Sequence, residues 1–221
     1  KNADDFYKRV KVALGLSVQI LTGEGEAFYS TQGILFDKNI KDPIITIMDI
    51  GGASTELIRV EVASKNILHS FSMPVGAVRM NNWREDGQMD SKLSKVLSDY
   101  KGDLDNVVTD TLYCVAGTMT SVGNIHLGNR SFVEESVNGH SMRTSEVELM
   151  LKEYKGKSAE KILELFPFLG KRAKTIYSGI ILSSKILKSL NVEKVIISTY
   201  GLRYGTLISE GLEEHYVWKR F

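Results

Sequence analysis

The segment Asp-Ile-Gly-Gly-Ala-Ser-Thr-Glu, residues 49–56, places carboxylates, hydroxyls and glycines between two strand-like runs. Glycine lets backbone N–H groups approach an anion closely, and the hydroxyls add donors. Asp49 and Glu56 are hard oxygen ligands of the kind that Mg²⁺ prefers beside phosphate. A Gly-Gly hairpin is most often a plain turn, but a plain turn has no need of four oxygen-bearing side chains. We therefore predict a phosphate-binding hairpin with a metal at the two acids. Its phosphate-binding residues are Gly51, Gly52, Ser54 and Thr55.

Two later segments carry groups that also suit phosphate. Gly117 and Thr118 open a predicted helix directly after a strand, so their N–H groups either bind an anion or belong to an ordinary capped turn. Arg203 follows the last predicted strand, and its planar guanidinium can pair with two phosphate oxygens. The alternative for Arg203 is a solvated residue at the start of a helix. The residues alone leave both pairs of alternatives open.

Glu26 lies in an acidic segment, residues 22–27, at the start of a predicted helix. A glutamate in a first helical turn complements the helix dipole and needs no catalytic role. The functional alternative is a general base that activates water for attack on phosphorus.

Two other features are weaker. His140 has no second metal ligand near it in the sequence, which argues against a zinc site. The basic residues between Lys152 and Lys174 are interleaved with glutamates, which is typical of a solvated helical face. A weak track for a polyanion is the alternative interpretation of that stretch.

Composition restricts the class of protein. The chain has 221 residues, 43% hydrophobic and 25% charged, which suits one large globular domain or two small ones. Its net charge of +1 provides no global field for nucleic acid or a membrane surface, and no apolar run is long enough to span a bilayer. The single cysteine, Cys114, excludes a disulfide framework and fits a cytoplasmic location.

The elements that position these residues follow a definite order. Strands are predicted for residues 44–49, 54–62 and 66–73, which form an antiparallel meander. Further strands are predicted for residues 17–21, 111–116 and 194–198. Helices are predicted for residues 6–15, 24–36, 91–101, 145–154, 159–166, 171–190 and 202–214.

A meander followed by alternating helix and strand is the ribonuclease-H-like order of the actin/sugar-kinase/Hsp70 superfold. We therefore predict an α/β half-domain of that superfold, with a mixed sheet and flanking helices. Residues 39–221 are expected to form the second ribonuclease-H-like domain, which carries the phosphate-binding hairpin. Residues 1–38 are expected to be the C-terminal remnant of the first.

Four segments together resemble the exopolyphosphatase/guanosine pentaphosphate phosphohydrolase (Ppx/GppA) family: residues 22–27, 49–56, 116–120 and 198–205. Residues 74–79 and the pair Arg172-Ala173 give secondary support. The resemblance covers nearly the whole chain and implies that Glu26 is the catalytic base. It also implies that Asp49 and Glu56 are the acids at the metal and the attacking water. The residues that it assigns to phosphate turns are Gly51, Gly52, Ser54, Thr55, Gly117 and Thr118.

The sequence departs from the family's pattern in a few places. Gly25 stands where the family often has another acid, Ala53 where it often has a third glycine, and Tyr204 where a glutamate is common. None of these changes removes a catalytic group that the resemblance implies. The family's first phosphate loop, of the type Asp-x-Gly-Ser-Asn-Ser, is not in these 221 residues. We therefore expect an N-terminally truncated fragment whose cleft lacks one wall.

The resemblance implies a Mg²⁺-dependent hydrolase that releases terminal phosphate from inorganic polyphosphate or guanosine pentaphosphate. The residues do not choose between these substrates. One alternative is a non-catalytic regulatory module that binds phosphate or guanosine tetraphosphate, and a weaker one is a kinase of the same superfold. Proteins of this superfold often dimerise, so a homodimer is also left open.

Overall fold

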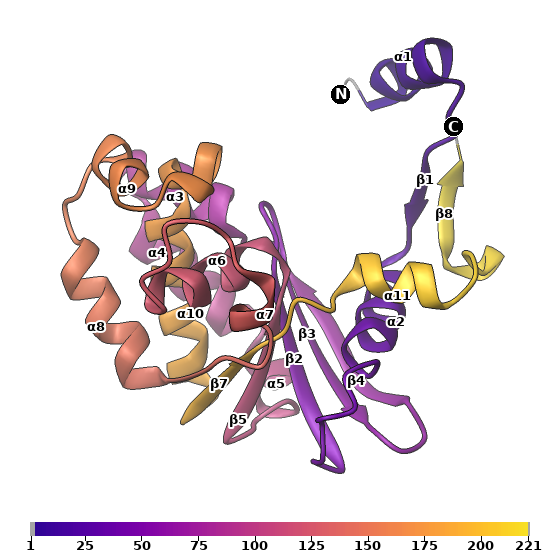
Figure 1. The fold of residues 1–221 in the computed structure, drawn as a ribbon. Coiled ribbons are helices and arrows are strands. Elements are labelled where there is room, and N and C mark those ends of the chain that lie inside the picture. Colours follow the sequence, from indigo (N-terminus) through magenta and orange to yellow (C-terminus); the bar gives the residue numbers. More distant parts are fainter. Residues whose placement is uncertain (1–2, 221) are drawn as a thin grey trace.

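The computed structural model describes residues 3–220, which are built around one mixed sheet (Figure 1). Within the described residues this sheet has six strands in the order β4-β3-β2-β5-β7-β6. Strands β2, β3 and β4 form the predicted antiparallel meander, β5 and β7 run parallel to β2, and β6 is antiparallel to β7. The bounds are β2 Ile44–Ile50, β3 Thr55–Glu61, β4 Asn66–Met73, β5 Thr111–Val115, β6 Ser141–Arg143 and β7 Lys194–Ile197. The prediction of an α/β fold with a mixed sheet is confirmed.

Helices cover both faces of this sheet (Figure 1). The larger group packs on one face and consists of α3 Ala77–Glu85, α4 Met89–Asp99, α5 Lys101–Asp105, α6 Ala116–His126, α7 Glu134–Val137, α8 Thr144–Tyr154, α9 Ala159–Leu165 and α10 Ile176–Ser189. Helix α2, Gly23–Ile34, packs on the other face. Among residues 3–220, no helix combines the length and the apolar character that a membrane span requires.

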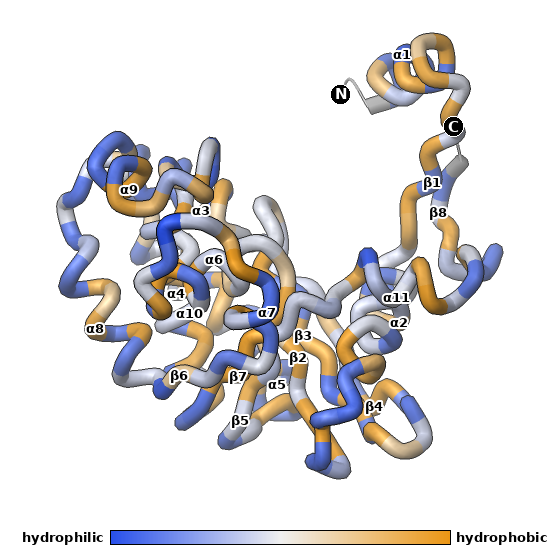
Figure 2. The backbone as a smooth tube through the Cα atoms, in the orientation of Figure 1, coloured by the Kyte–Doolittle hydropathy of each residue, from blue (hydrophilic) through white to orange (hydrophobic). Residues whose placement is uncertain are grey.

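The alternation of side chains along the central strands creates two cores. Ile47 and Tyr113 point to the α2 face, whereas the next residues, Met48 and Cys114, point to the face covered by α3, α6 and α10. All four are buried, and Figure 2 shows hydrophobic residues along these strands. Because a shift of one residue would exchange the two faces, burial on both sides fixes the register between neighbouring strands.

The two ends of the described chain lie together, away from the sheet (Figure 1). Strand β1, Gln19–Leu21, pairs antiparallel with β8, Val217–Arg220, and helix α1, Ala3–Leu14, lies beyond this ribbon. Helix α11, Leu202–Ile208, crosses α2 so closely that a Cβ atom at Gly205 would collide with the carbonyl oxygen of Tyr29. Helix α2 thus packs on both the sheet and α11. Assignment of residues 1–38 to another half-domain stays a prediction.

Two helix boundaries differ from the prediction. The helix predicted for residues 171–190 is divided into a 3₁₀ segment, η1 Pro167–Lys174, and α10. Within η1, Gly170 has φ 50° and ψ −124°, which interrupts the helical path. The helix predicted for residues 202–214 ends at Ile208, because Glu210 (φ 56°) and Gly211 (φ 145°) turn the backbone. A second 3₁₀ segment, η2 Glu214–Tyr216, follows. Strands β6 and β8 and helix α3 were not predicted.

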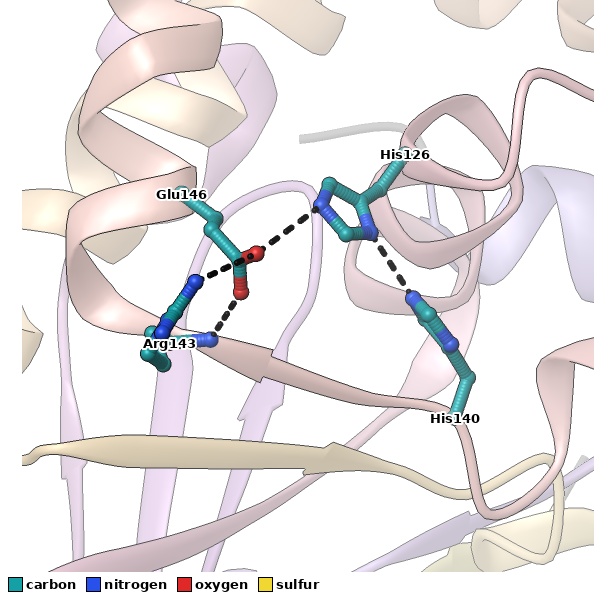
Figure 3. A network of polar contacts seen from close by, with 4 residues as sticks. All are labelled: His126, His140, Arg143 and Glu146. Atoms are coloured by element: carbon teal, nitrogen blue, oxygen red, sulfur yellow. Dashed lines mark hydrogen bonds and ion pairs between the residues drawn. The ribbon is translucent and has the colours of Figure 1, made fainter.

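A polar network joins the end of α6, the segment at β6 and the start of α8 (Figure 3). Nδ1 of His126 lies 2.9 Å from Nε2 of His140, and Nε2 of His126 lies 3.9 Å from Oε1 of Glu146. The backbone N–H of Arg143 donates to Oε2 of Glu146 at 2.7 Å. The fold thus brings His126, fourteen residues earlier in the sequence, beside His140. Among residues 3–220, however, no group of three His, Cys, Asp or Glu side chains is arranged to hold a metal ion.

This network makes folding sensitive to acid. Burial, and then the proximity of His126, lowers the pKa of His140, while Glu146 acts in the opposite direction. The unfolded chain therefore binds this proton more readily, and stability is lost as the pH falls below about 6.5. We expect urea unfolding midpoints at pH 7.5 and pH 5.5 to differ less for His140→Gln than for the wild type. His215→Gln, at an exposed histidine, is the control and keeps the wild-type difference. An undiminished difference in His140→Gln would contradict the assignment.

Candidate active site

The acidic hairpin lies where β2 ends and β3 begins. Asp49 stands opposite Glu56 in the strand register, and Ile50 stands opposite Thr55. The turn between them is closed by the N–H of Gly51, which donates to the carbonyl of Ser54 at 3.0 Å. The predicted hairpin is therefore present, and its two carboxylates belong to directly paired residues.

The start of α3 holds the hairpin from one side. The N–H of Ala77 donates to the carbonyl of Gly51 at 2.9 Å, and the N–H groups of Val78 and Arg79 donate to the carbonyl of Gly52 at 2.9 and 3.1 Å. A Cβ atom at Gly76 would lie 2.6 Å from the Gly51 carbonyl oxygen, so only glycine permits this approach. The hairpin carbonyls are thus occupied. The N–H groups of Gly52 and Ala53, by contrast, have no hydrogen-bond acceptor within residues 3–220.

The hairpin borders a cavity of about 200 Å³. Its other walls are the starts of α3 and α6 and the junction between η1 and α10. Strand β5 runs parallel to β2 with Val115 opposite Asp49, which brings the first turn of α6 to the hairpin. The lining residues that carry the argument are Gly51, Gly52, Gly117, Thr118, Arg172 and Thr175. The structure therefore brings the two predicted phosphate turns together at one cavity.

Arg172 was not among the predicted site residues. A Cβ atom at Gly117 would lie 2.5 Å from Nη2 of Arg172, so the guanidinium group lies directly against this glycine. The contact places a cation at the cavity, and a side chain at position 117 would displace the guanidinium group. The Arg172-Ala173 pair supported the family resemblance, and this was the signal that could have identified the residue.

Three carboxylates near the hairpin interact electrostatically, although none of them is among the residues that line this cavity. Burial, followed by the charges of Glu56 and Glu26, raises the pKa of Asp49 to about 7. Burial, and then the charge of Glu56, also raises the pKa of Glu26. Thr22 caps α2 by accepting the N–H of Gly25 at 3.0 Å, which holds Glu26 in the first turn of this helix.

The acids suit a divalent cation. Among the described residues, neither Asp49, Glu56 nor Glu26 forms an ion pair, and the Ser72 hydroxyl donates to Glu56 at 2.7 Å. Mg²⁺ is usually held by one or two carboxylates together with substrate phosphates. The paired Asp49 and Glu56 match that donor set, and a cation would relieve their repulsion.

The remaining predicted residues occupy different positions. The buried Thr55 hydroxyl donates to the carbonyl of Val75 at 2.6 Å, so it joins the hairpin to the segment before α3. Ser54 is half-buried in the turn. Arg203 is exposed on α11 and is not among the residues that line the cavity. Its contact with phosphate stays a prediction.

The raised pKa of Asp49 has a measurable consequence. Its unfolded carboxyl ionises near pH 4 and its folded carboxyl near pH 7, so the folded state binds more protons between these values. Stability is therefore lost as the pH rises through this window. We expect Asp49→Asn to raise the free energy of unfolding at pH 8, without divalent cations, by about 2 to 4 kcal/mol. Denaturant unfolding measures this, with Asp86→Asn, an exposed acid, as the control. Equal stability of Asp49→Asn and wild type at pH 8 would refute the burial argument.

Comparison with known proteins places the chain among phosphatases. Residues 1–214 match the sequence pattern of the Ppx/GppA phosphatase family. A guanosine-5'-triphosphate,3'-diphosphate pyrophosphatase of Aeromonas salmonicida is 28% identical over 212 residues, which cover 93% of this chain and 41% of that protein. The chain thus spans less than half the length of this relative.

Solved structures agree with this placement. The crystal structure of the Aquifex aeolicus member of the Ppx/GppA family is 25% identical, with a TM-score of 0.76, and the match covers 95% of this chain and 69% of that one. An exopolyphosphatase of Cytophaga hutchinsonii, 20% identical over 95% of this chain and 70% of its own, has a TM-score of 0.81 and supports the fold alone. The predicted superfold is confirmed by these neighbours. Because the family pattern covers almost all of the sequence, the chain belongs to the Ppx/GppA phosphatase family.

Proposed function

We propose that this chain carries the catalytic acids and a phosphate-binding hairpin of a hydrolase that releases the terminal phosphate of polyphosphate or guanosine pentaphosphate. The observation that carries the proposal is the proximity of unlike groups: the hairpin, the Gly117-Thr118 turn and Arg172 line one cavity, and Asp49 directly precedes its lining residues Ile50 and Gly51. Three carboxylates, Glu26, Asp49 and Glu56, influence one another's ionisation beside a hairpin that offers free N–H donors. A relative is named as a guanosine-5'-triphosphate,3'-diphosphate pyrophosphatase, which supports this class of reaction.

In this proposal the hairpin and Arg172 bind the phosphoryl group. The N–H groups of Gly52 and Ala53 and the guanidinium of Arg172 would donate to its oxygens, where negative charge accumulates during transfer. Mg²⁺, bound by Asp49 and Glu56, would supply further neutralisation of that charge.

In this proposal Glu26 is the general base that activates the attacking water. Its raised pKa makes the carboxylate a better proton acceptor than an ordinary glutamate near neutral pH. As the water oxygen bonds to the terminal phosphorus, its proton passes to this carboxylate. The bridging P–O bond breaks at the same time, and the shortened phosphate chain leaves with the bond's electrons.

A non-catalytic phosphate-binding module is the alternative function. Binding of guanosine tetraphosphate or short polyphosphate, without phosphate release by any form of the protein, would favour it. Measurable hydrolysis by the 221-residue chain would exclude it. A cytoplasmic location, a homodimer and the absence of nucleic-acid partners remain predictions from the sequence.

Replacement of the proposed base gives a direct test. We expect Glu26→Gln in the intact protein to reduce kcat for phosphate release from polyphosphate by about 10² to 10⁴, because general-base assistance is lost. KM should change little, since the hairpin still binds the phosphate. Glu24→Gln, in the same helical turn and exposed, is the matched control. Unchanged turnover in Glu26→Gln would remove this residue from the mechanism.

The arginine makes a separate prediction. Arg172→Lys keeps the charge but loses the planar guanidinium that pairs with two phosphate oxygens. We expect KM for polyphosphate to rise about tenfold, equivalent to about 1.4 kcal/mol. The neighbouring exposed lysine provides the control, Lys171→Ala, which should behave as wild type. Identical kinetics for Arg172→Lys and wild type would show that Arg172 only supports Gly117.

A further inference from the structure

A row of three polar side chains crosses the sheet at the acidic hairpin. Asp49 of β2 stands opposite Glu56 of β3, and Glu56 in turn stands opposite Ser72 of β4. Directly opposite residues of antiparallel strands point to the same face of a sheet, with Cβ atoms about 4.5 to 5.5 Å apart. Glu56 therefore has a carboxylate on one side and a hydroxyl on the other. The hydroxyl has no role in the proposed mechanism.

This row faces helix α2. Ile58, two residues after Glu56, is buried in the core beneath α2, and side chains two residues apart in a strand share a face. Phe71 packs against the core on the opposite face, so the next residue, Ser72, also points toward the α2 face. Helix α2 carries Glu26, whose pKa is raised by burial and then by the charge of Glu56. Ser72 thus lies on the side of the sheet that carries the acids.

The hydrogen bond between Ser72 and Glu56 is short. Oγ of Ser72 donates to Oε1 of Glu56 at 2.7 Å, a length typical of a hydroxyl that donates to a carboxylate. Among the described residues, no other group donates to the Glu56 side chain, and its Oε2 has no hydrogen-bond partner. The bond therefore holds one carboxylate oxygen and leaves the other for a ligand.

The strand segment that carries Ser72 is itself fixed by packing. Phe71 is partly buried on one side of this residue, and the side chain of Met73 is completely buried on the other. Met73 pairs with Thr55, whose hydroxyl donates to the carbonyl of Val75 at 2.6 Å. The position of the Ser72 hydroxyl is thus determined by the fold and does not depend on Glu56.

The Glu56 side chain, by contrast, has reasons to leave this position. It is half-buried, and the charges of Asp49 and Glu26 favour rotamers that turn it into solvent. A solvent-exposed hydrogen bond contributes an amount comparable to the entropy lost when a glutamate is held in one rotamer. Because these effects nearly balance, loss of the hydroxyl changes the rotamers of Glu56 and leaves the fold intact.

We propose that Ser72 is a positioning residue for the proposed hydrolysis, because its hydroxyl holds Glu56 in the rotamer that shares a cation with Asp49. The inference rests on the proposed function and gives Ser72 no contact with the substrate. Mg²⁺ demands a near-ideal arrangement of its oxygen ligands. A Glu56 side chain that samples other rotamers should therefore bind the cation more weakly.

Two variants of the same shape test the role of the hydroxyl. Threonine and valine are both β-branched and suit a strand, so Ser72→Thr keeps the hydroxyl and Ser72→Val replaces it by a methyl group. In calorimetric titration of Mg²⁺ into the intact protein without substrate, we expect Ser72→Val to raise Kd about three- to tenfold. Ser72→Thr should stay within about twofold of wild type. Ser70→Val, at an exposed serine two residues earlier on the same face of β4, is the control and should match wild type.

Kinetics and unfolding separate positioning from a structural role. At a Mg²⁺ concentration equal to the wild-type Kd, kcat for phosphate release from polyphosphate should fall about two- to fivefold in Ser72→Val, as the lower occupancy of the cation site requires. Excess Mg²⁺ should restore kcat, and KM should stay unchanged. Urea unfolding midpoints of Ser72→Thr and Ser72→Val without divalent cations should agree.

Equal Mg²⁺ affinity for Ser72→Thr and Ser72→Val would overturn the proposal, whether both variants match wild type or both are weakened. So would a loss of kcat that excess Mg²⁺ does not restore, or the absence of Mg²⁺ binding by the wild type. Failure of the proposed function is a separate result. The wild type would then release no phosphate from polyphosphate or guanosine pentaphosphate, while the difference in Mg²⁺ affinity between the two variants would persist.

Discussion

The mutual repulsion of three carboxylates is the constraint on which the site depends. Asp49 and Glu56 are directly paired residues of neighbouring strands, and Glu26 adds a third charge from α2. Isolated in water, such groups would move apart. Here the strand register prevents this, because Met48 and Ile47 on either side of the pleat are buried in separate cores. Packing energy from both faces therefore sustains an electrostatic arrangement that is unfavourable without a positive counter-charge.

The carbonyl groups and the N–H groups of the hairpin differ in whether they have hydrogen-bond partners. The first N–H groups of a helix normally lack partners, and in α3 they are satisfied by the carbonyls of Gly51 and Gly52. This exchange uses the carbonyls of Gly51 and Gly52 and leaves the N–H groups of Gly52 and Ala53 without an acceptor among the described residues. The arrangement favours an anion over a cation at these backbone groups, as the proposed function requires. The close approach at Gly76 is the geometric condition for it.

Turns and strands formed by residues that are neighbours in the sequence could be predicted, whereas contacts between distant segments could not. The hairpin, the meander and the Gly117-Thr118 turn depend on neighbouring residues, and the structure contains all three. The place of Arg172 depends on the path of η1, which Gly170 redirects through a positive φ that no periodicity reveals. Strands β6 and β8, of three and four residues, lack the apolar run that identified the equally short β1 and β7. The role of Arg203 rested on its residue type and on its place after the last predicted strand, and this side chain is not among those that line the cavity.

Helix α3 links the hairpin to the packed interior. Its first turn fixes the hairpin, and its last turn carries Arg84, which is anchored through Asn81 to Ser178 of α10. Because α10 follows directly after the η1 segment that carries Arg172, the packing of α3 on α10 also ties the hairpin to the segment of the arginine.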